Sequence, residues 1–216
     1  MAITRDATDE IQVKSAVVQA CETFGGIDIL VNNAVIFNRK GVLEMPLDEW
    51  RRQLAVMLDG AFLLTKRVAQ SMVHRGSGGS IINIISTAGH QGEPHNIGYC
   101  TGKSGLLNFT RSAAMELVRH GIRVNSLTPT ATDPSESFER AVRWGRDPST
   151  TGRRVEDYER FRARVPTQKL PQPRDFANAA VFLASDDAQM ITGTDLRVDG
   201  GAIARYWAWD PSSSGR

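Results

Sequence analysis

The stretch SIINIIS, residues 80–86, decides the fold, because it is a short apolar run between the glycine-rich turn GSGG and a polar Ser86. Continuous runs of this length are typical of strands that are buried on both faces of a parallel sheet. We interpret IDILVNNA (27–34) in the same way, as a strand buried on both faces. Further strands are expected at GIRVNSLTP (121–129) and TDLRVDGG (194–201).

Helical patterns separate these runs. Residues 8–24 place apolar side chains at helical spacing, with Thr8 as the expected N-cap and Gly25-Gly26 as the stop. A long helix is expected over about 47–74, and another over about 97–119. Strands that alternate with helices of this length predict an α/β fold, a Rossmann-like doubly wound parallel sheet.

Composition limits the class of protein. At 216 residues, with 41% hydrophobic and 23% charged residues, the chain is expected to form one domain, 1–216. The net charge of +2 gives no reason to propose nucleic acid as a partner. No apolar run approaches the ~20 residues that span a bilayer, and no leader segment opens the chain. Cys21 and Cys100 indicate two reduced thiols, so we expect a cytoplasmic protein without a membrane partner.

Residues 130–175 interrupt the alternation, because they combine prolines, arginines and acids with little periodicity. We expect short helices there that form a lid over the substrate and include Trp144; a solvated charged surface is the alternative. The last segment, 204–216, begins with aromatic residues that we expect to pack on a neighbouring subunit and ends in PSSSGR, which we expect to be disordered. The aromatic residues are Tyr206, Trp207 and Trp209.

The stretch GYCTGKSG (98–105) has two incompatible interpretations. Gly102-Lys103-Ser104 is similar to the end of a phosphate-binding P-loop, whereas Tyr99 and Lys103 are four residues apart and would share one face of a helix. The P-loop needs GxxxxGK[ST] directly after a strand. Here the glycine spacing is one residue short, and the preceding strand ends about a dozen residues too early, so we reject that interpretation.

The helical interpretation brings in Ser86, at the end of a strand where parallel sheets place functional side chains. A free tyrosine has a pKa of about 10, and an ammonium ~5 Å away at an effective dielectric of ~20 would lower it by roughly two units. Burial would offset part of this. Tyr99 is therefore a candidate general acid or base, with Lys103 as its cation and Ser86 as the donor to a substrate oxygen. Each of the three, taken alone, has an ordinary structural explanation.

Together these residues resemble the Ser…Tyr-x-x-x-Lys signature of the short-chain dehydrogenases/reductases. DILVNNA (28–34) resembles the family's Asn-Asn-Ala-Gly strand end, with Val35 in place of the glycine, and RDATD (5–9) resembles its Asp-Val-Thr/Ser stretch. GIRVNSLTP and VDGG are similar to the family's last strands. The resemblance covers nearly the whole chain.

The resemblance implies reversible carbonyl reduction or alcohol oxidation on a small-molecule substrate, with NAD or NADP as cofactor. It makes Ser86, Tyr99 and Lys103 the catalytic residues and implies that the lysine also holds the nicotinamide ribose. A homodimer or homotetramer, with 47–74 and 97–119 at the interface, is implied as well. The other implied cofactor-binding positions are Asp6, Ala7, Asn33, Ala34 and Thr132.

Three features depart from the family pattern. The Gly-rich cofactor loop and about two βα units are missing, so we expect an N-terminally truncated member. The family's active-site asparagine falls at Met57, whose thioether is a poor acceptor. Pro129 is followed by Thr130 where the family has glycine. These departures leave an alternative open, a catalytically silent homologue that acts only through oligomer contacts.

The sequence does not identify the substrate. His90 and His95 lie between Ser86 and Tyr99, where a substrate loop should run, and we expect both at the surface. The arginines of 140–164 would favour an anionic substrate, but neighbouring acids cancel most of their charge.

Overall fold

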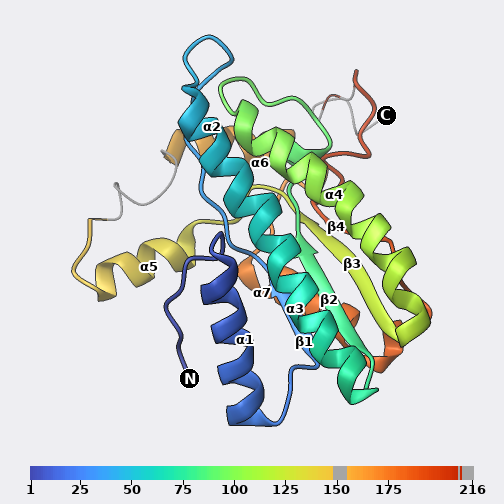
Figure 1. Ribbon diagram of the computed structural model, residues 1–216. Helices are drawn as coiled ribbons and strands as arrows, with labels where there is room; N and C mark the ends of the chain where they lie inside the picture. The colour runs from blue at the N-terminus through green and yellow to red at the C-terminus, as the bar shows by residue number, and fades with distance from the viewer. Residues whose placement is uncertain (148–154, 209, 211–216) are drawn as a thin grey trace.

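The computed structural model of the protein describes residues 1–147, 155–208 and 210. Its centre is a four-stranded sheet in which every neighbouring pair is parallel, in the order β1-β2-β3-β4 (Figure 1). The strands are β1 (Ile29–Asn32), β2 (Gly79–Ile84), β3 (Ile122–Pro129) and β4 (Asp195–Val198).

Helices cover both faces of this sheet, which is the arrangement of a doubly wound α/β fold (Figure 1). One layer holds α1 (Glu10–Phe24), α3 (Gly60–Arg75) and α4 (Ile97–Leu117), and α7 (Pro173–Ala184) packs on the other face. Across the described ranges, no helix has the length and apolar character needed to cross a membrane. The predicted fold class is therefore confirmed.

Alternating side chains of the central strands form the core on the two faces of the sheet. Ile81 and Val124 are fully buried with Val68 and Met72 of α3. On the opposite face of the sheet, Ile82 of β2 and Leu127 of β3 pack with Leu183 of α7. The buried core on the α3 side of the sheet also includes Val17, Ala69, Ala113, Ala114 and Ile122.

The prediction that the first strand is buried on both faces is wrong. Ile29 and Val31 are 49% and 46% exposed. In the described structure β1 pairs with β2 alone, and α7 packs chiefly on β2, β3 and β4, so this side of β1 stays about half exposed. Leu30, on the opposite face, packs against the core beneath the helices.

The segment predicted as one long helix is helical throughout but changes its hydrogen bonding in the middle. It begins as α2 (Leu47–Leu54), passes through a five-residue π-helical turn at Ala55–Asp59 and continues as α3. Such π turns occur mostly as single insertions within α-helices and often lie at functional sites. Met57 lies in this turn and is 1% exposed.

The predicted start of the first helix is shifted by one residue. Asp9, rather than Thr8, is the N-cap, and its carboxylate accepts hydrogen bonds from the backbone N–H groups of Ile11 and Gln12. Thr8 instead donates its hydroxyl hydrogen to the Asp6 carboxylate. Gly25, at φ 81°, ends the helix as predicted.

The charged segment after β3 forms short helices outside the sheet, as expected. They are α5 (Ser135–Arg143) and α6 (Val155–Arg164). Trp144 ends α5 with an exposed ring beside the guanidinium groups of Arg140 and Arg146. In the C-terminal tail, Tyr206 and Trp207 are exposed and their rings are 5.4 Å apart; Trp209 and PSSSGR lie outside the described residues.

Candidate active site

A pocket of about 400 Å³ lies where the strands end, at the edge that open α/β sheets use for ligands. Each strand contributes the residues that follow it. Phe37 comes after β1, Ser86 after β2, Thr130 and Ala131 after β3, and Ala202 after β4. Tyr99 of α4 and residues of α6 complete the lining. The pocket therefore brings Ser86 and Tyr99 together, as the sequence predicts.

Ser86 is positioned by the short 3-10 turn Thr87–Gly89 that it caps. Its Oγ accepts a hydrogen bond of 3.2 Å from the backbone N–H of Ala88. Because a hydroxyl has one hydrogen and two lone pairs, Ser86 keeps its own O–H for another acceptor.

Gly89 lets this turn approach α4 closely. A Cβ at this position would lie 2.9 Å from Ile85 Cγ2 and 3.0 Å from the backbone carbon of Lys103. The missing side chain therefore fixes the spacing between the turn that carries Ser86 and the helix that carries Tyr99 and Lys103.

Tyr99 lies in the first turn of α4, and Lys103 is one helical turn further on. The Tyr99 ring packs on Phe37, with ring centroids 5.6 Å apart and planes at 56°. The Lys103 ammonium lies 5.8 Å from the centroid of the Tyr99 ring. The two side chains thus share one face of the helix, and the P-loop interpretation fails, since Gly102-Lys103-Ser104 lies within α4.

Lys103 is only 3% exposed, and this burial lowers its pKa to about 8. Its Nζ donates a hydrogen bond of 2.5 Å to the backbone carbonyl of Ile84, the last residue of β2. An ammonium carries three N–H donors, and among the described residues this carbonyl is its only hydrogen-bond acceptor. The other N–H donors of this ammonium have no acceptor among the described residues.

Three of the expected cofactor positions lie together. Ala7, Asn33 and Ala34 line a second cavity of about 130 Å³, whose wall includes Met57. Asp6 comes directly before Ala7 in the chain. Hydrogen bonds from the backbone N–H and the hydroxyl of Thr8 hold the pKa of the Asp6 carboxyl below its ordinary value. Thr132 is half-buried in the loop after β3, two residues beyond Thr130 of the larger pocket.

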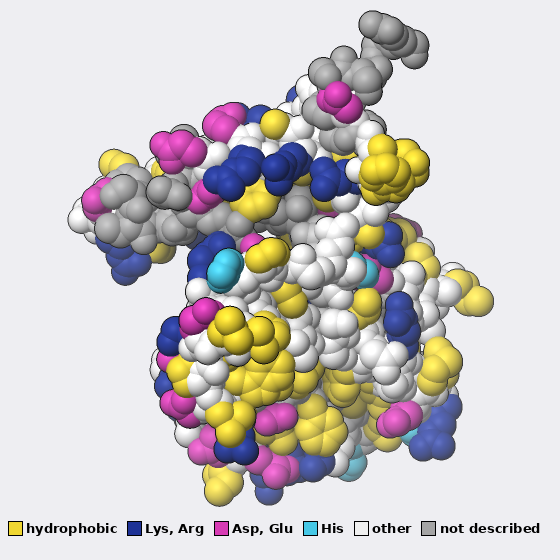
Figure 2. All heavy atoms as spheres, turned by 90° about the horizontal axis from the view of Figure 1, so that it is seen from above, with side chains coloured by type: hydrophobic (Ala, Val, Ile, Leu, Met, Phe, Trp, Pro, Cys, Tyr) yellow, Lys and Arg dark blue, Asp and Glu magenta, His cyan; other side chains and the backbone are white. Residues whose placement is uncertain are grey.

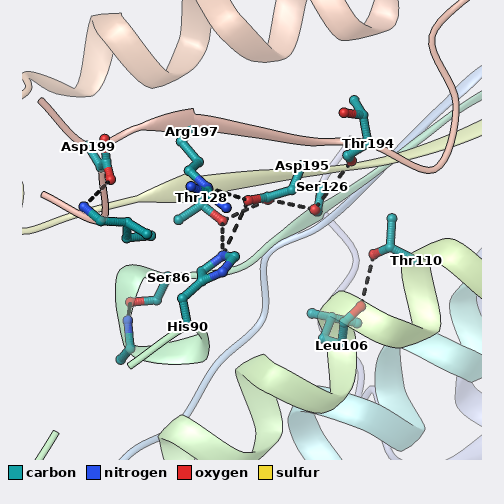
Figure 3. A network of polar contacts seen from close by, with 12 residues as sticks. Ser86, His90, Leu106, Thr110, Ser126, Thr128, Thr194, Asp195, Arg197 and Asp199 are labelled. Atoms are coloured by element: carbon teal, nitrogen blue, oxygen red, sulfur yellow. Dashed lines mark hydrogen bonds and ion pairs between the residues drawn. The ribbon is translucent and has the colours of Figure 1, made fainter. Parts of the chain in front are cut away.

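His90 corrects another expectation, because it is not a surface residue. Its side chain is 11% exposed, and its Nε2 lies 3.2 Å from Asp195 Oδ2 and 3.2 Å from Thr128 Oγ1 (Figure 3). Asp195 Oδ1 also accepts hydrogen bonds of 2.7 Å from the hydroxyls of Ser126 and Thr128. Figure 3 shows the imidazole reaching from the turn after Ser86 toward β3 and β4. His95, in contrast, is exposed as expected.

Comparison with known proteins identifies the family of the chain. Residues 1–202 match a family model described as enoyl-(acyl carrier protein) reductase. An uncharacterized oxidoreductase of Thermotoga maritima is 40% identical over 204 residues, which are 94% of this chain and 76% of that protein. Galactitol 2-dehydrogenase of Agrobacterium fabrum is 37% identical, over 93% of this chain and 77% of that protein.

A solved structure gives the same result. The crystal structure of a putative short-chain dehydrogenase/reductase from Burkholderia xenovorans superposes with a TM-score of 0.82 at 33% identity, covering 95% of this chain and 75% of that one. The chain belongs to the short-chain dehydrogenase/reductase family. Its relatives are oxidoreductases that include a dehydrogenase of a polyol.

Sequence reasoning missed several residues of the pocket. Phe37, Phe161 and Arg205 line it, yet each lies in a segment without a recognisable motif. The only available signal was position, since these segments follow β1, β3 and β4 and functional side chains gather at the carboxyl ends of parallel strands. Trp144 does not line the pocket, whereas Arg164, at the end of α6, does.

Proposed function

We propose that this protein interconverts a secondary alcohol and a carbonyl compound with NAD or NADP as cofactor. The observation that carries the proposal is that Ser86 and Tyr99 line one pocket while a buried ammonium lies 5.8 Å from the Tyr99 ring. The family supports the same reaction class, since its members among the relatives are oxidoreductases.

Tyr99 moves the proton in this proposal. Its phenol donates to the carbonyl oxygen in reduction and its phenolate accepts the hydroxyl proton in oxidation. The Lys103 ammonium stabilises the phenolate, because it is close and lies in a buried region of low dielectric. The Ser86 hydroxyl donates to the same substrate oxygen and stabilises the negative charge that develops there.

Lys103 is the residue that best fits a nicotinamide ribose, since its ammonium has donors to spare. We assign Asp6, Ala7, Asn33, Ala34 and Thr132 to the rest of the cofactor site, with Tyr99 beside the reacting ring. The chemistry that a bound nicotinamide cofactor supplies is hydride exchange with the substrate carbon.

The proposal also includes a lid over the pocket and an oligomeric assembly. The segment 130–175 serves as the lid, which is supported by the α6 residues in the pocket lining. A homodimer or homotetramer is supported by a groove of about 740 Å³ between α3 and α4, lined by apolar and polar side chains in about equal numbers. Its apolar residues include Phe62, Ala69, Val73, Phe109 and Leu117.

The test is cofactor binding to the full chain, measured by calorimetry with NAD and NADP. We expect binding that weakens in Lys103→Ala and persists in Tyr99→Phe, because the phenol is needed for proton transfer rather than affinity. Absence of binding at millimolar cofactor would contradict the proposal. It would favour the alternative, a catalytically silent homologue that acts through contacts at the α3–α4 groove.

A further inference from the structure

The arginines after β3 do not all have the same surroundings. Three of those within the described residues are paired with acids on the same helix. The pairs are Arg140 with Glu136 at 4.0 Å, Arg160 with Asp157 at 2.6 Å, and Arg162 with Glu159 at 2.7 Å. Arg164, the last residue of α6, has no carboxylate within ion-pair distance in the described part of the chain, and it lines the active-site pocket.

A second arginine reaches the same place from the other end of the fold. Arg205 follows β4, lines the same pocket, and donates a hydrogen bond of 2.8 Å from Nη1 to the backbone carbonyl of Arg164. This bond joins α6 to the segment after β4 and keeps the two arginines together at the wall of the pocket. Figure 2 looks onto this end of the molecule and shows basic side chains gathered along one side.

The charge of the pocket is unbalanced. Among the described residues of its lining, Glu93 is the only acid, and it is already engaged. Its Oε2 accepts a hydrogen bond of 2.9 Å from Asn96, and its Oε1 lies 3.9 Å from the guanidinium of Arg39. Two guanidinium groups face one carboxylate, which Arg39 already partners from outside the lining, so this wall of the pocket is net positive.

We propose that Arg164 and Arg205 form a carboxylate-binding subsite and that the substrate is a hydroxy acid or the corresponding oxo acid. This inference rests on the proposed function, because it places the reacting oxygen at Ser86 and Tyr99 of the same pocket. Guanidinium groups match a carboxylate with paired hydrogen bonds. The carboxylate itself takes no part in the reaction.

The experiment compares two ligands of one shape, cyclohexanecarboxylate and cyclohexanecarboxamide, by calorimetry on the full chain. We expect the wild type to bind the carboxylate about tenfold more tightly than the amide. Arg164→Gln and Arg205→Gln should abolish this preference, and Arg164→Lys should keep part of it because the charge remains. Arg160→Gln on the same helix is the matched control and should retain the full preference, which should fall as salt is added.

Equal affinities for the two ligands in the wild type, or no binding of either, would overturn the inference. Tighter binding of cyclohexyl phosphate than of the carboxylate, lost in Arg164→Gln, would overturn the choice of a carboxylate. Failure of the proposed function is a separate result. In that case the arginine-dependent preference persists while neither nicotinamide cofactor binds.

Discussion

The imidazole of His90 lies 3.2 Å from the carboxylate of Asp195, so the turn that carries Ser86 is tied to the last strand of the sheet. The two side chains are 11% and 9% exposed, and Thr128 completes the contact from β3. Residues separated by about half of the chain thus support one wall of the pocket.

This contact predicts a difference between two histidines. His90→Asn should lower the free energy of unfolding by roughly 1–3 kcal/mol, because it leaves the buried Asp195 carboxylate with fewer partners. Denaturant unfolding measures the change. His95→Asn is the matched control, since His95 is exposed and its φ of 58° is one that asparagine tolerates. Equal effects of the two variants would contradict the role of His90.

Burial of Lys103 predicts a dependence of stability on pH. Its pKa falls from 10.5 to about 8 on folding, so between these pH values the unfolded chain binds a proton that the folded chain does not. Stability from this residue should therefore rise with pH through that window, by about 3 kcal/mol in total, and the full penalty should be present below it.

Unfolding of wild type and Lys103→Met should be followed from neutral pH to above pH 10. Lys103→Met should lack this rise in the free energy of unfolding. The variant should therefore be more stable than wild type at neutral pH, and this difference in stability should shrink as pH increases. Lys14→Met, at an exposed position of α1, controls for the loss of a lysine. A constant difference in unfolding free energy between wild type and Lys103→Met over this pH range would contradict the buried, pKa-shifted state of Lys103.

Gly89 offers a test of the close approach between the Ser86 turn and α4. Gly89→Ala should cost about 1–3 kcal/mol of stability, because its Cβ would lie 2.9 Å from Ile85 and 3.0 Å from Lys103 backbone. In Gly92→Ala the added Cβ meets nothing within 4 Å, so thermal unfolding should change little. A harmless Gly89→Ala would show that the turn and the helix are not held together.

Removal of the Ser86 hydroxyl should affect the reaction more than the fold. Ser86→Ala loses one hydrogen bond to the Ala88 N–H, and a cap of this kind contributes about 1 kcal/mol. Turnover should fall about 10²–10³-fold, because a donor to the developing oxyanion is lost. Cofactor binding should be unchanged. Turnover at the wild-type level would remove Ser86 from the site.

Much of the fold could be predicted from local patterns, because each strand is a short, largely apolar or alternating run between turns. The failures lie where tertiary surroundings decide the outcome. The run at 27–34 has the composition of a buried strand, yet its burial depends on which helices pack on β1, and α7 packs chiefly on β2, β3 and β4. The π turn at Ala55–Asp59 leaves no mark in the apolar spacing.

In the candidate site, too, local patterns were predictable and tertiary contacts were not. Tyr99 and Lys103 were predictable, since their spacing fixes one helix face, and Ser86 was predictable from its place at a strand end. The partnership of His90 with Asp195 was not, because it depends on β2, β3 and β4 lying side by side. Arg205 joins the pocket for the same reason.

The central claim is that Tyr99 exchanges the proton with the substrate. Its most direct test is reduction of NAD or NADP by secondary alcohols, followed by nicotinamide absorbance, in wild type and in Tyr99→Phe. Phenylalanine keeps the ring that packs on Phe37, so the fold and cofactor binding should remain. We predict a loss of turnover of about 10²–10⁴-fold in Tyr99→Phe. Turnover of Tyr99→Phe at the wild-type rate would contradict the account.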